Sequence, residues 1–383
     1  MARDEKQADK WRANKGEWSE LYTAMRLIGD GKIALSYDTS TQATDTWMEV
    51  VGVIRKETKD RIVAYSMDEN NTDVIIDVNG SPVAKIAASD FTVAADDLMD
   101  KIQHGKSTFT ASEEAVTFLK LAEVLKLKAG SGDKNDIYLT TLDSRTGLKR
   151  DRIGFSIKSY FGNDPTLFNT ASASGLIYQI NGINDDDMNH INSLVDSKNH
   201  AAVQSRCDAI IKTASSVVFK DYVIAKKAKV RAFRDNLELL NPLLPEAIEW
   251  ILSDHFFQGN KDVTLPAAVN RLAQANPHQI SRPHLKYQYM FKAFLYATYC
   301  RMTASTLWDG KGVVNGGYID VSKTGKITCH YALESDEFKD YLYNLAYLDF
   351  PSTNQDHGDY GYVYKNNNDY FFNLNFQIRL RKI

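Results

Sequence analysis

Cysteine pairs and long apolar runs are both missing from this chain. Only three cysteines occur among the 383 residues, at Cys207, Cys300 and Cys329, and none forms a CxxC pair. This usage argues against a disulfide framework and against a structural zinc site. No apolar segment approaches the length of a membrane span, and the polar start of the chain does not resemble a signal peptide. We therefore expect a cytoplasmic protein with reduced thiols.

The chain also lacks a strong excess of charge of either sign. Lys and Arg number 46 and Asp and Glu number 49, which gives a net charge of -3. Overall charge therefore does not indicate nucleic-acid binding, although a basic cleft can exist on an acidic protein. The 43% hydrophobic content is ordinary for a globular protein, and the length predicts roughly two or three subdomains.

Apolar spacing and turn residues predict an α/β protein. An amphipathic helix is expected at 15–30, and Glu17 in its first turn complements the helix dipole. Short β-prone runs fill 32–93. Pro242 and Pro245 disfavour helix just before them, so we place a boundary after residue 240. The other predicted helices lie at 90–104, 112–128, 185–240, 244–257, 264–275 and 283–304, and a β-hairpin is predicted at 316–331.

The candidate chemistry centres on a predicted hairpin at 136–159. Asp136 opens its first strand, and Lys158 lies near the end of the second. If the strands pair antiparallel, these two charged residues meet at one edge of the hairpin. A carboxylate can hold a metal ion, and a lysine can orient water and hold negative charge. The pair is a minimal site for cleaving a phosphodiester, but an acid and a lysine on adjacent strands are also common in proteins without this chemistry.

Longer motifs around this hairpin resemble a known family. Asn135-Asp136, a gap of about twenty residues and then Phe155-Ser156-Ile157-Lys158 resemble the PD-(D/E)xK nuclease core. The run from Gly154 to Ser159, with 162–172 after it, resembles the HpaII-type family of type II restriction endonucleases. Segments 14–22 and 374–379 resemble that family too, so the similarity covers both ends and the middle of the chain.

Two positions depart from the nuclease pattern. Asn135 replaces a proline whose role is only conformational, whereas Ser156 replaces the second acid and removes a charged metal ligand. Within the superfamily, the helix before the core sheet often carries an acid that reaches the metal. The resemblance therefore makes Glu17 the expected substitute, with Glu20 as the alternative. It implies a catalytic set of Lys158, Asp136 and Glu17, with Mg²⁺ at Asp136, Glu17 and Ile157.

Candidate DNA contacts fall into three groups. The polar face of the last predicted strand has the chemistry for base edges in the major groove, although a solvated strand face explains it equally well. Small polar residues after Lys158 suit phosphate contacts, and arginines near the hairpin turn suit either phosphate or solvent. The strand face carries Asn375, Gln377, Arg379 and Arg381. The small polar residues after Lys158 are Ser159, Asn163, Thr166, Asn169 and Ser172, and the arginines near the turn are Arg150 and Arg152.

The resemblance implies a bacterial restriction endonuclease that makes Mg²⁺-dependent, sequence-specific cuts in double-stranded DNA. A CCGG-type site is one candidate target, but a shared fold does not transmit specificity. The implied fold is α/β, with a PD-(D/E)xK core whose central mixed sheet is flanked by helices. That core occupies 1–240, and a helical and then β region at 241–383 assists DNA recognition. A cognate DNA methyltransferase would protect the host DNA without binding this chain, and a palindromic target favours a homodimer.

Two other hypotheses stay open. The first is a non-cleaving DNA-binding protein on a decayed nuclease core, which Ser156 favours and the retained Asp136 and Lys158 oppose. The second is a helical interaction protein that works through 185–304, which leaves the hairpin motif unexplained.

Overall fold

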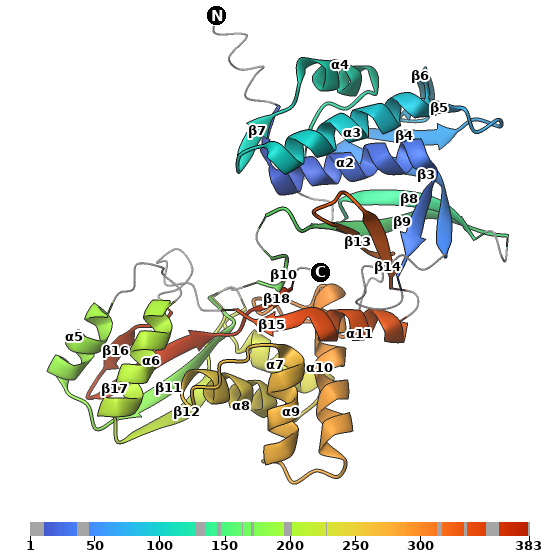
Figure 1. The fold of residues 1–383 in the computed structure, drawn as a ribbon. Coiled ribbons are helices and arrows are strands. Elements are labelled where there is room, and N and C mark those ends of the chain that lie inside the picture. The colour runs from blue at the N-terminus through green and yellow to red at the C-terminus, as the bar shows by residue number, and fades with distance from the viewer. Residues whose placement is uncertain are drawn as a thin grey trace, which may run out of the picture. The chain divides into compact units, whose positions relative to one another are not determined.

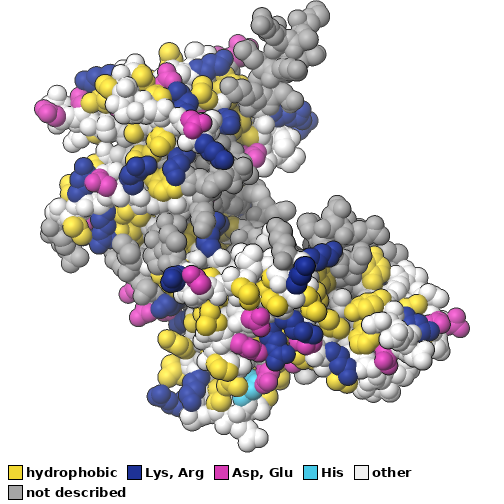
Figure 2. All heavy atoms as spheres, turned by 180° about the vertical axis from the view of Figure 1, so that it is seen from behind, with side chains coloured by type: hydrophobic (Ala, Val, Ile, Leu, Met, Phe, Trp, Pro, Cys, Tyr) yellow, Lys and Arg dark blue, Asp and Glu magenta, His cyan; other side chains and the backbone are white. Residues whose placement is uncertain are grey.

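The computed structural model describes residues 11–36, 46–127, 135–143, 147–162, 164–169, 172–194, 201–226, 228–311, 316–332, 335–349 and 360–381. Over these residues the chain is a mixed α/β protein (Figure 1). No helix in these ranges is long and apolar enough to cross a membrane. On the face seen in Figure 2, Lys and Arg side chains are interspersed with Asp and Glu, in keeping with the net charge of -3.

Contacts divide the chain into two compact units. Unit 1 is Met1–Pro165, Val314–Tyr341 and Lys382–Ile383, and unit 2 is Thr166–Val313 and Leu342–Arg381. The chain passes between them at positions that differ from the 240/241 boundary expected from the prolines. The assignment of 1–240 to catalysis and 241–383 to DNA recognition stays a prediction.

Unit 1 is built on a nine-stranded mixed sheet. Its strands are β2 (Lys32–Leu35), β3 (Trp47–Thr58), β4 (Arg61–Met67), β5 (Asp73–Val78), β6 (Ser81–Ala87), β8 (Ile137–Asp143), β9 (Leu148–Ser159), β13 (Gly317–Val321) and β14 (Ile327–Tyr331). Their order is β2-β14-β13-β9-β8-β3-β4-β5-β6, and β2 also pairs with β3. β13 runs parallel to β9, and β14 runs parallel to β2, whereas the other neighbours are antiparallel. The predicted hairpin at 316–331 is therefore part of the central sheet.

Helix α2 (Lys15–Asp30) packs against one face of this sheet, and its bounds match the prediction. Its apolar positions, among them Trp18, Leu21 and Met25, are buried in the same cluster as apolar residues of the sheet. Gly31 ends the helix in the left-handed region, at φ 63°. Helix α3 (Ala88–His104) lies beside α2 (Figure 1), so α2 is covered on two sides.

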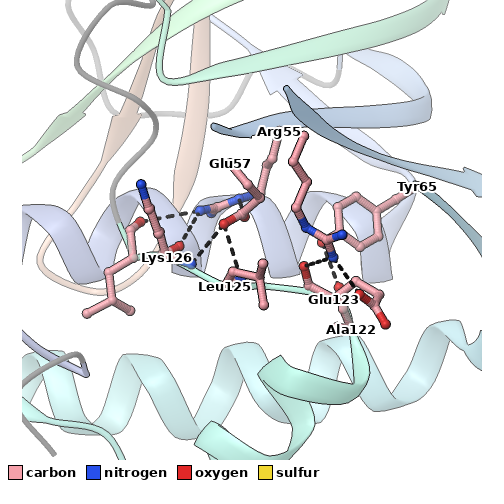
Figure 3. Close-up of polar contacts among 9 residues, drawn as sticks. Arg55, Glu57, Tyr65, Ala122, Glu123, Leu125 and Lys126 are labelled. Carbon is pink, nitrogen blue, oxygen red and sulfur yellow. Dashed lines mark hydrogen bonds and ion pairs between the residues drawn. The ribbon is translucent and has the colours of Figure 1, made fainter. Parts of the chain in front are cut away.

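Helix α4 (Glu113–Leu121) is shorter than the predicted 112–128 because side chains of β3 hold the chain that follows it (Figure 3). One oxygen of Glu57 accepts hydrogen bonds from the backbone N–H of Leu125, at 3.1 Å, and of Lys126, at 2.8 Å. Arg55 donates to the carbonyl oxygens of Lys126 and Leu127. These contacts satisfy backbone groups that a longer helix would pair internally. A short pair of β1 (Arg12–Asn14) and β7 (Thr108–Thr110) completes this part of the unit.

Unit 2 contains two smaller sheets and most of the helices. β12 (Ser216–Tyr222), β11 (Gly175–Asn181), β17 (Asp369–Asn375) and β16 (Val363–Asn366) form one sheet in that order, and β10 (Thr166–Phe168), β18 (Ile378–Leu380) and β15 (Ala346–Leu348) form the other. The helices are α5 (Asp185–Ser193), α6 (Ala201–Thr213), α7 (Ala232–Leu240), α8 (Leu244–Phe256), α9 (Leu265–Ala275) and α10 (Pro283–Tyr299), and α11 (Ser335–Leu345) begins in unit 1. The prediction that 185–240 is largely helical is wrong at β12, because pairing with β11 holds that segment extended.

The end of the chain differs from the single alternating strand that the sequence suggests. It forms two strands in different sheets, with a break at Phe376 and Gln377. β17 lies between β11 and β16, and β18 lies between β10 and β15. Asn375, at the end of β17, is fully buried, and Gln377, between the two strands, is 6% exposed. The exposed polar face that the alternation suggested, for DNA or for solvent, is therefore wrong at these two residues.

Candidate active site

The β8–β9 hairpin brings Asp136 against the second strand, as its sequence predicts. Ile137 lies opposite Phe155, so the antiparallel register places Asp136 beside Ser156. The backbone N–H of Asp136 donates to the carbonyl of Phe155 at 3.0 Å, and the N–H of Ile157 donates to Asp136 Oδ2 at 2.7 Å. Main chain and side chain together thus fix the carboxylate of Asp136 at the edge of the hairpin.

Gly154 allows the segment before Asp136 to lie close to β9. A Cβ atom at this position would lie 2.3 Å from Nδ2 of Asn135, closer than any non-bonded contact tolerates. Asn135 is itself 7% exposed. A side chain larger than hydrogen at residue 154 would push Asn135, and with it Asp136, away from the strand.

Lys158 lies on the same face of the sheet as Asp136. Phe155 and Ile157 belong to the core shared with α2, and successive residues of a strand point to opposite faces. Ser156 and Lys158 therefore point away from α2. Ile137 also belongs to this core, so its neighbour Asp136 points to the same face as Ser156 and Lys158. The Nζ atom of Lys158 lies 4.6 Å from the centroid of the Tyr318 ring.

The hairpin itself supplies one carboxylate to this edge, because Ser156 stands where the motif has its second acid. No group of three or more His, Cys, Asp or Glu side chains suited to a metal ion occurs among the residues that the structure describes. Asp143, at the far end of β8, pairs with Leu148 and so lies away from Lys158. Any second acid beside Asp136 must come from outside the hairpin.

Glu17 lies in the first turn of α2, where it completes a capping box. Its Oε2 accepts a hydrogen bond from the backbone N–H of Asn14 at 3.1 Å, and its own N–H donates to Asn14 Oδ1 at 2.9 Å. Two residues later, the hydroxyl groups of Ser19 and Ser159 are 2.8 Å apart. The start of α2 therefore lies at the end of β9, next to Lys158 in sequence, but on the opposite face of the sheet. Glu17 thus caps the start of α2, in addition to complementing the helix dipole as the sequence predicts.

The structure adds acidic and aromatic groups that the sequence did not assign to the site. In the parallel pair of β9 and β13, Asp320 lies directly beside Lys158, and Tyr318 lies beside Ser156. Asp320 is 5% exposed, and its Oδ2 lies 3.0 Å from Nε2 of His330 on β14. The sequence offered one signal for this part of the site, which is the acid Asp320 inside the apolar run of β13. The sequence could not connect Asp320 with Lys158, because about 160 residues separate the two and only the register of the sheet brings them together.

The candidate DNA contacts near the hairpin lie at both ends of β9. Ser159 is engaged with Ser19, as described above. Arg150 donates to the hydroxyl of Tyr331 and lies over its ring, and Arg152 is exposed. Eight residues separate Arg150 from Lys158, which corresponds to about 26 Å along a strand. These arginines are thus remote from the Asp136 edge.

The other candidate contacts, apart from Asn163, lie in unit 2. Thr166 of β10 lies directly opposite Arg379 of β18. The guanidinium of Arg379 is paired with Asp349, and that of Arg381 donates to the carbonyl of Asn344. Asn169 is exposed and Ser172 is half-buried, whereas Asn163 falls outside the described residues.

Comparison with known proteins identifies the class of enzyme. A sequence model of the HpaII restriction endonuclease family matches residues 14–380. The type II restriction enzyme HpaII of Haemophilus parainfluenzae is 30% identical over 368 residues, which cover 96% of this chain and 98% of that enzyme. No solved structure matches the chain.

The protein is therefore a restriction enzyme, a type II site-specific deoxyribonuclease that acts on double-stranded DNA. Within that class, the chain belongs to the HpaII restriction endonuclease family. Type II restriction endonucleases generally use a divalent metal ion, and the hairpin edge that carries Asp136 is the candidate place for it.

Proposed function

We propose that this enzyme makes Mg²⁺-dependent, sequence-specific double-strand cuts in DNA through a PD-(D/E)xK core formed by the β8–β9 hairpin. The observation that carries the proposal is the contact between Asp136 Oδ2 and the backbone N–H of Ile157, one residue before Lys158. It supports a carboxylate and a lysine on one face of a mixed sheet, at the strand positions that the motif requires.

The donor atoms at this edge fit a hard divalent cation. The carboxylate of Asp136 and the main-chain carbonyl of Ile157 are oxygen ligands, which Mg²⁺ prefers. We keep Glu17, the acid expected from the family resemblance, as the second carboxylate for the ion. Because α2 packs on the face of the sheet opposite Asp136, Glu17 would have to reach the ion around the end of β9, where Ser19 contacts Ser159. Its bond to Asn14 uses one oxygen, and a carboxylate has further lone pairs. When bound, a magnesium ion supplies an activated water and positive charge at the scissile phosphate.

The protein's own groups would position the reactants. Asp136 is held by two bonds to β9, so its carboxylate needs little reorganisation to accept the ion. Lys158 would hold the negative charge that develops on the phosphate and orient the attacking water. Both residues project from the central sheet, which is a more rigid support than a loop.

The role of Glu17 can be separated from its capping role by two substitutions. Gln at this position preserves a capping box, so Glu17→Gln should melt at the wild-type temperature while it cuts DNA at least about 100-fold more slowly. Asn14→Ala removes the cap but leaves the acid, so it should lose about 0.5–2 kcal/mol of stability and still cut. Thermal melting and single-turnover cleavage measure the two effects.

Glu20→Gln serves as the comparison for this test, because Glu20 is the alternative acid on the same helix. Normal cutting by Glu17→Gln together with slow cutting by Glu20→Gln would assign the metal to Glu20. Normal cutting by both variants would remove α2 from the metal site.

DNA contacts are proposed at the exposed and half-buried polar groups. Thr166, Asn169 and Ser172, together with Arg150 and Arg152, suit phosphate contacts. Arg379 is paired with Asp349 and Arg381 donates to the carbonyl of Asn344, and both arginines remain candidates for DNA contacts. Burial leaves Asn375 and Gln377 without a surface for base contacts in this structure.

A CCGG-type target is proposed for this chain only through its family. Sequencing the ends of digested DNA gives the target, the cut position and the overhang together. A methyltransferase that modifies the same sequence would protect the host, and a palindromic target would favour action as a homodimer.

Digestion of plasmid DNA with and without Mg²⁺ tests the proposed function. Discrete fragments with Mg²⁺, and none when EDTA removes it, are the expected result. A gel shift without cutting, in either Mg²⁺ or Mn²⁺, would instead support the non-cleaving DNA-binding protein for which Ser156 argues.

A further inference from the structure

Lys158 lies against an aromatic ring from a distant part of the chain. Tyr318 on β13 is 5% exposed, and its ring centroid is 4.6 Å from the Nζ atom of Lys158. The face of an aromatic ring attracts an ammonium group, most strongly where water is excluded. A lysine side chain rotates about four carbon–carbon bonds, so such a contact restricts where its charge lies.

The ring of Tyr318 is supported in turn by helix α11. Phe338 meets it edge to face, with ring centroids 5.6 Å apart, and Phe338 stacks on Tyr341. Tyr341 stacks on His330 with centroids 3.7 Å apart. His330 lies opposite Tyr318 in the β13–β14 pair, so the stack begins and ends on neighbouring positions of the sheet.

A buried carboxylate anchors this stack. Asp320 Oδ2 accepts hydrogen bonds from the hydroxyl groups of Tyr341, at 2.8 Å, and Tyr160, at 3.1 Å, and it lies 3.0 Å from His330 Nε2. Burial, and then the negative charge of Asp320, raises the pKa of both tyrosines, so both stay protonated as donors. The cluster therefore ties β13, β14 and α11 together directly beside Lys158.

Two polar atoms of the cluster have no hydrogen-bond partner among the residues that the structure describes. These atoms are Asp320 Oδ1 and His330 Nδ1. Both are buried, in side chains that are only 7% and 3% exposed. Unpaired buried groups of this kind cost stability. The cluster borders the candidate site, because Asp320 lies beside Lys158 in the β9–β13 pair.

We propose that Tyr318 is a positioning residue for Lys158, and that the Asp320–His330–Tyr341 cluster holds its ring in place. This inference rests on the proposed function, because it assumes that Lys158 acts at the scissile phosphate. Tyr318 would contact neither DNA nor metal and would act only by positioning the ammonium group of Lys158.

The test compares two substitutions of Tyr318. Tyr318→Phe keeps the ring and loses only the hydroxyl, whereas Tyr318→Leu loses the ring. We expect Tyr318→Leu to lower the single-turnover cleavage rate about 3- to 30-fold with unchanged DNA affinity, and Tyr318→Phe to cut at close to the wild-type rate. Trp47→Leu is the matched control, because it removes a similar contact, 4.5 Å from Lys32, on strands away from Lys158.

A second readout does not depend on activity. In protein labelled with ¹³C-lysine, the ring current of Tyr318 should shift the Lys158 ε-methylene resonance upfield, with the Lys158→Arg spectrum giving its assignment. Tyr318→Phe should keep the shift and Tyr318→Leu should lose it. A wild-type resonance at the ordinary lysine position would overturn the inference even if a variant fails to fold.

The outcomes separate this inference from the function on which it rests. If Lys158→Ala cuts normally, the proposed function is wrong. If Lys158→Ala is inactive but Tyr318→Leu cuts as well as Tyr318→Phe, only the positioning role is wrong. Parallel losses of rate and melting temperature in both Tyr318 variants would make Tyr318 a purely structural residue.

Discussion

Replacing Lys158 with alanine should lower the rate of DNA cleavage by about 100- to 1,000-fold while DNA binding is retained. The reason is that Lys158 supplies charge to the transition state at a fixed point of the sheet, one residue from the Ile157 N–H that holds Asp136. Removal of its side chain leaves the backbone of β9 and the core beneath it unchanged, since Lys158 points away from that core. Single-turnover cleavage of a plasmid and a gel shift measured without Mg²⁺ separate the two effects.

Lys85→Ala is the control for this experiment. Lys85 also projects from a strand of the same sheet, with its side chain 55% exposed and paired with Asp68 and Asp73. It lies on β6, at the far edge of the sheet from β9. Cleavage by Lys158→Ala at the rate of Lys85→Ala would refute the catalytic role of Lys158.

Replacing Glu57 with alanine should destabilise unit 1 by about 3–5 kcal/mol. The Glu57 side chain is fully buried, and one of its oxygens lies 3.3 Å from Nε of Arg55, whose side chain is only 5% exposed. Its other oxygen accepts the N–H groups of Leu125 and Lys126 (Figure 3). The substitution therefore leaves a buried guanidinium without its counter-charge and two backbone donors without an acceptor. Urea unfolding followed by tryptophan fluorescence measures the loss, because three of the five tryptophans, among them the buried Trp18 of α2, belong to unit 1.

Two further variants test the physical reason. Glu238→Ala, which breaks an exposed pair with Arg234, should have little effect on stability. The double variant Arg55→Met, Glu57→Leu should recover much of the loss, because it removes the isolated charge together with its partner. If the double variant is no more stable than Glu57→Ala alone, the uncompensated charge is not the cause.

The hairpin at the site could be predicted because its signals are local. Alternating apolar residues define β8 and β9, the turn between them is short, and antiparallel pairing of neighbours then brings Asp136 to Ile157. The helix at 15–30 was predictable for the same reason, since apolar spacing, Asn14 and Gly31 mark its face and both ends.

The last strand shows where local signals fail. Alternation at 373–381 correctly indicates extended chain, but the same pattern describes an edge strand and a central one. β17 and β18 each lie between two other strands, and Asn375 and Gln377, at the end of β17 and between the two strands, are buried. Burial of a polar residue depends on what packs over it, and neighbours that are distant in sequence leave no trace in the pattern.

By itself, the sequence determined that a carboxylate and a lysine meet at one end of a hairpin, and that the second acid of the motif is missing at Ser156. These facts depend on residue identity and on pairing between neighbouring strands. Only the tertiary structure decided what surrounds Lys158, because the parallel register of β9 with β13 sets Tyr318 and Asp320 beside it from far along the chain. It also decided that α2 packs on the face of the sheet opposite Lys158. Which distant strand lies beside β9 is fixed by the packing of the whole sheet, and no local pattern encodes that choice.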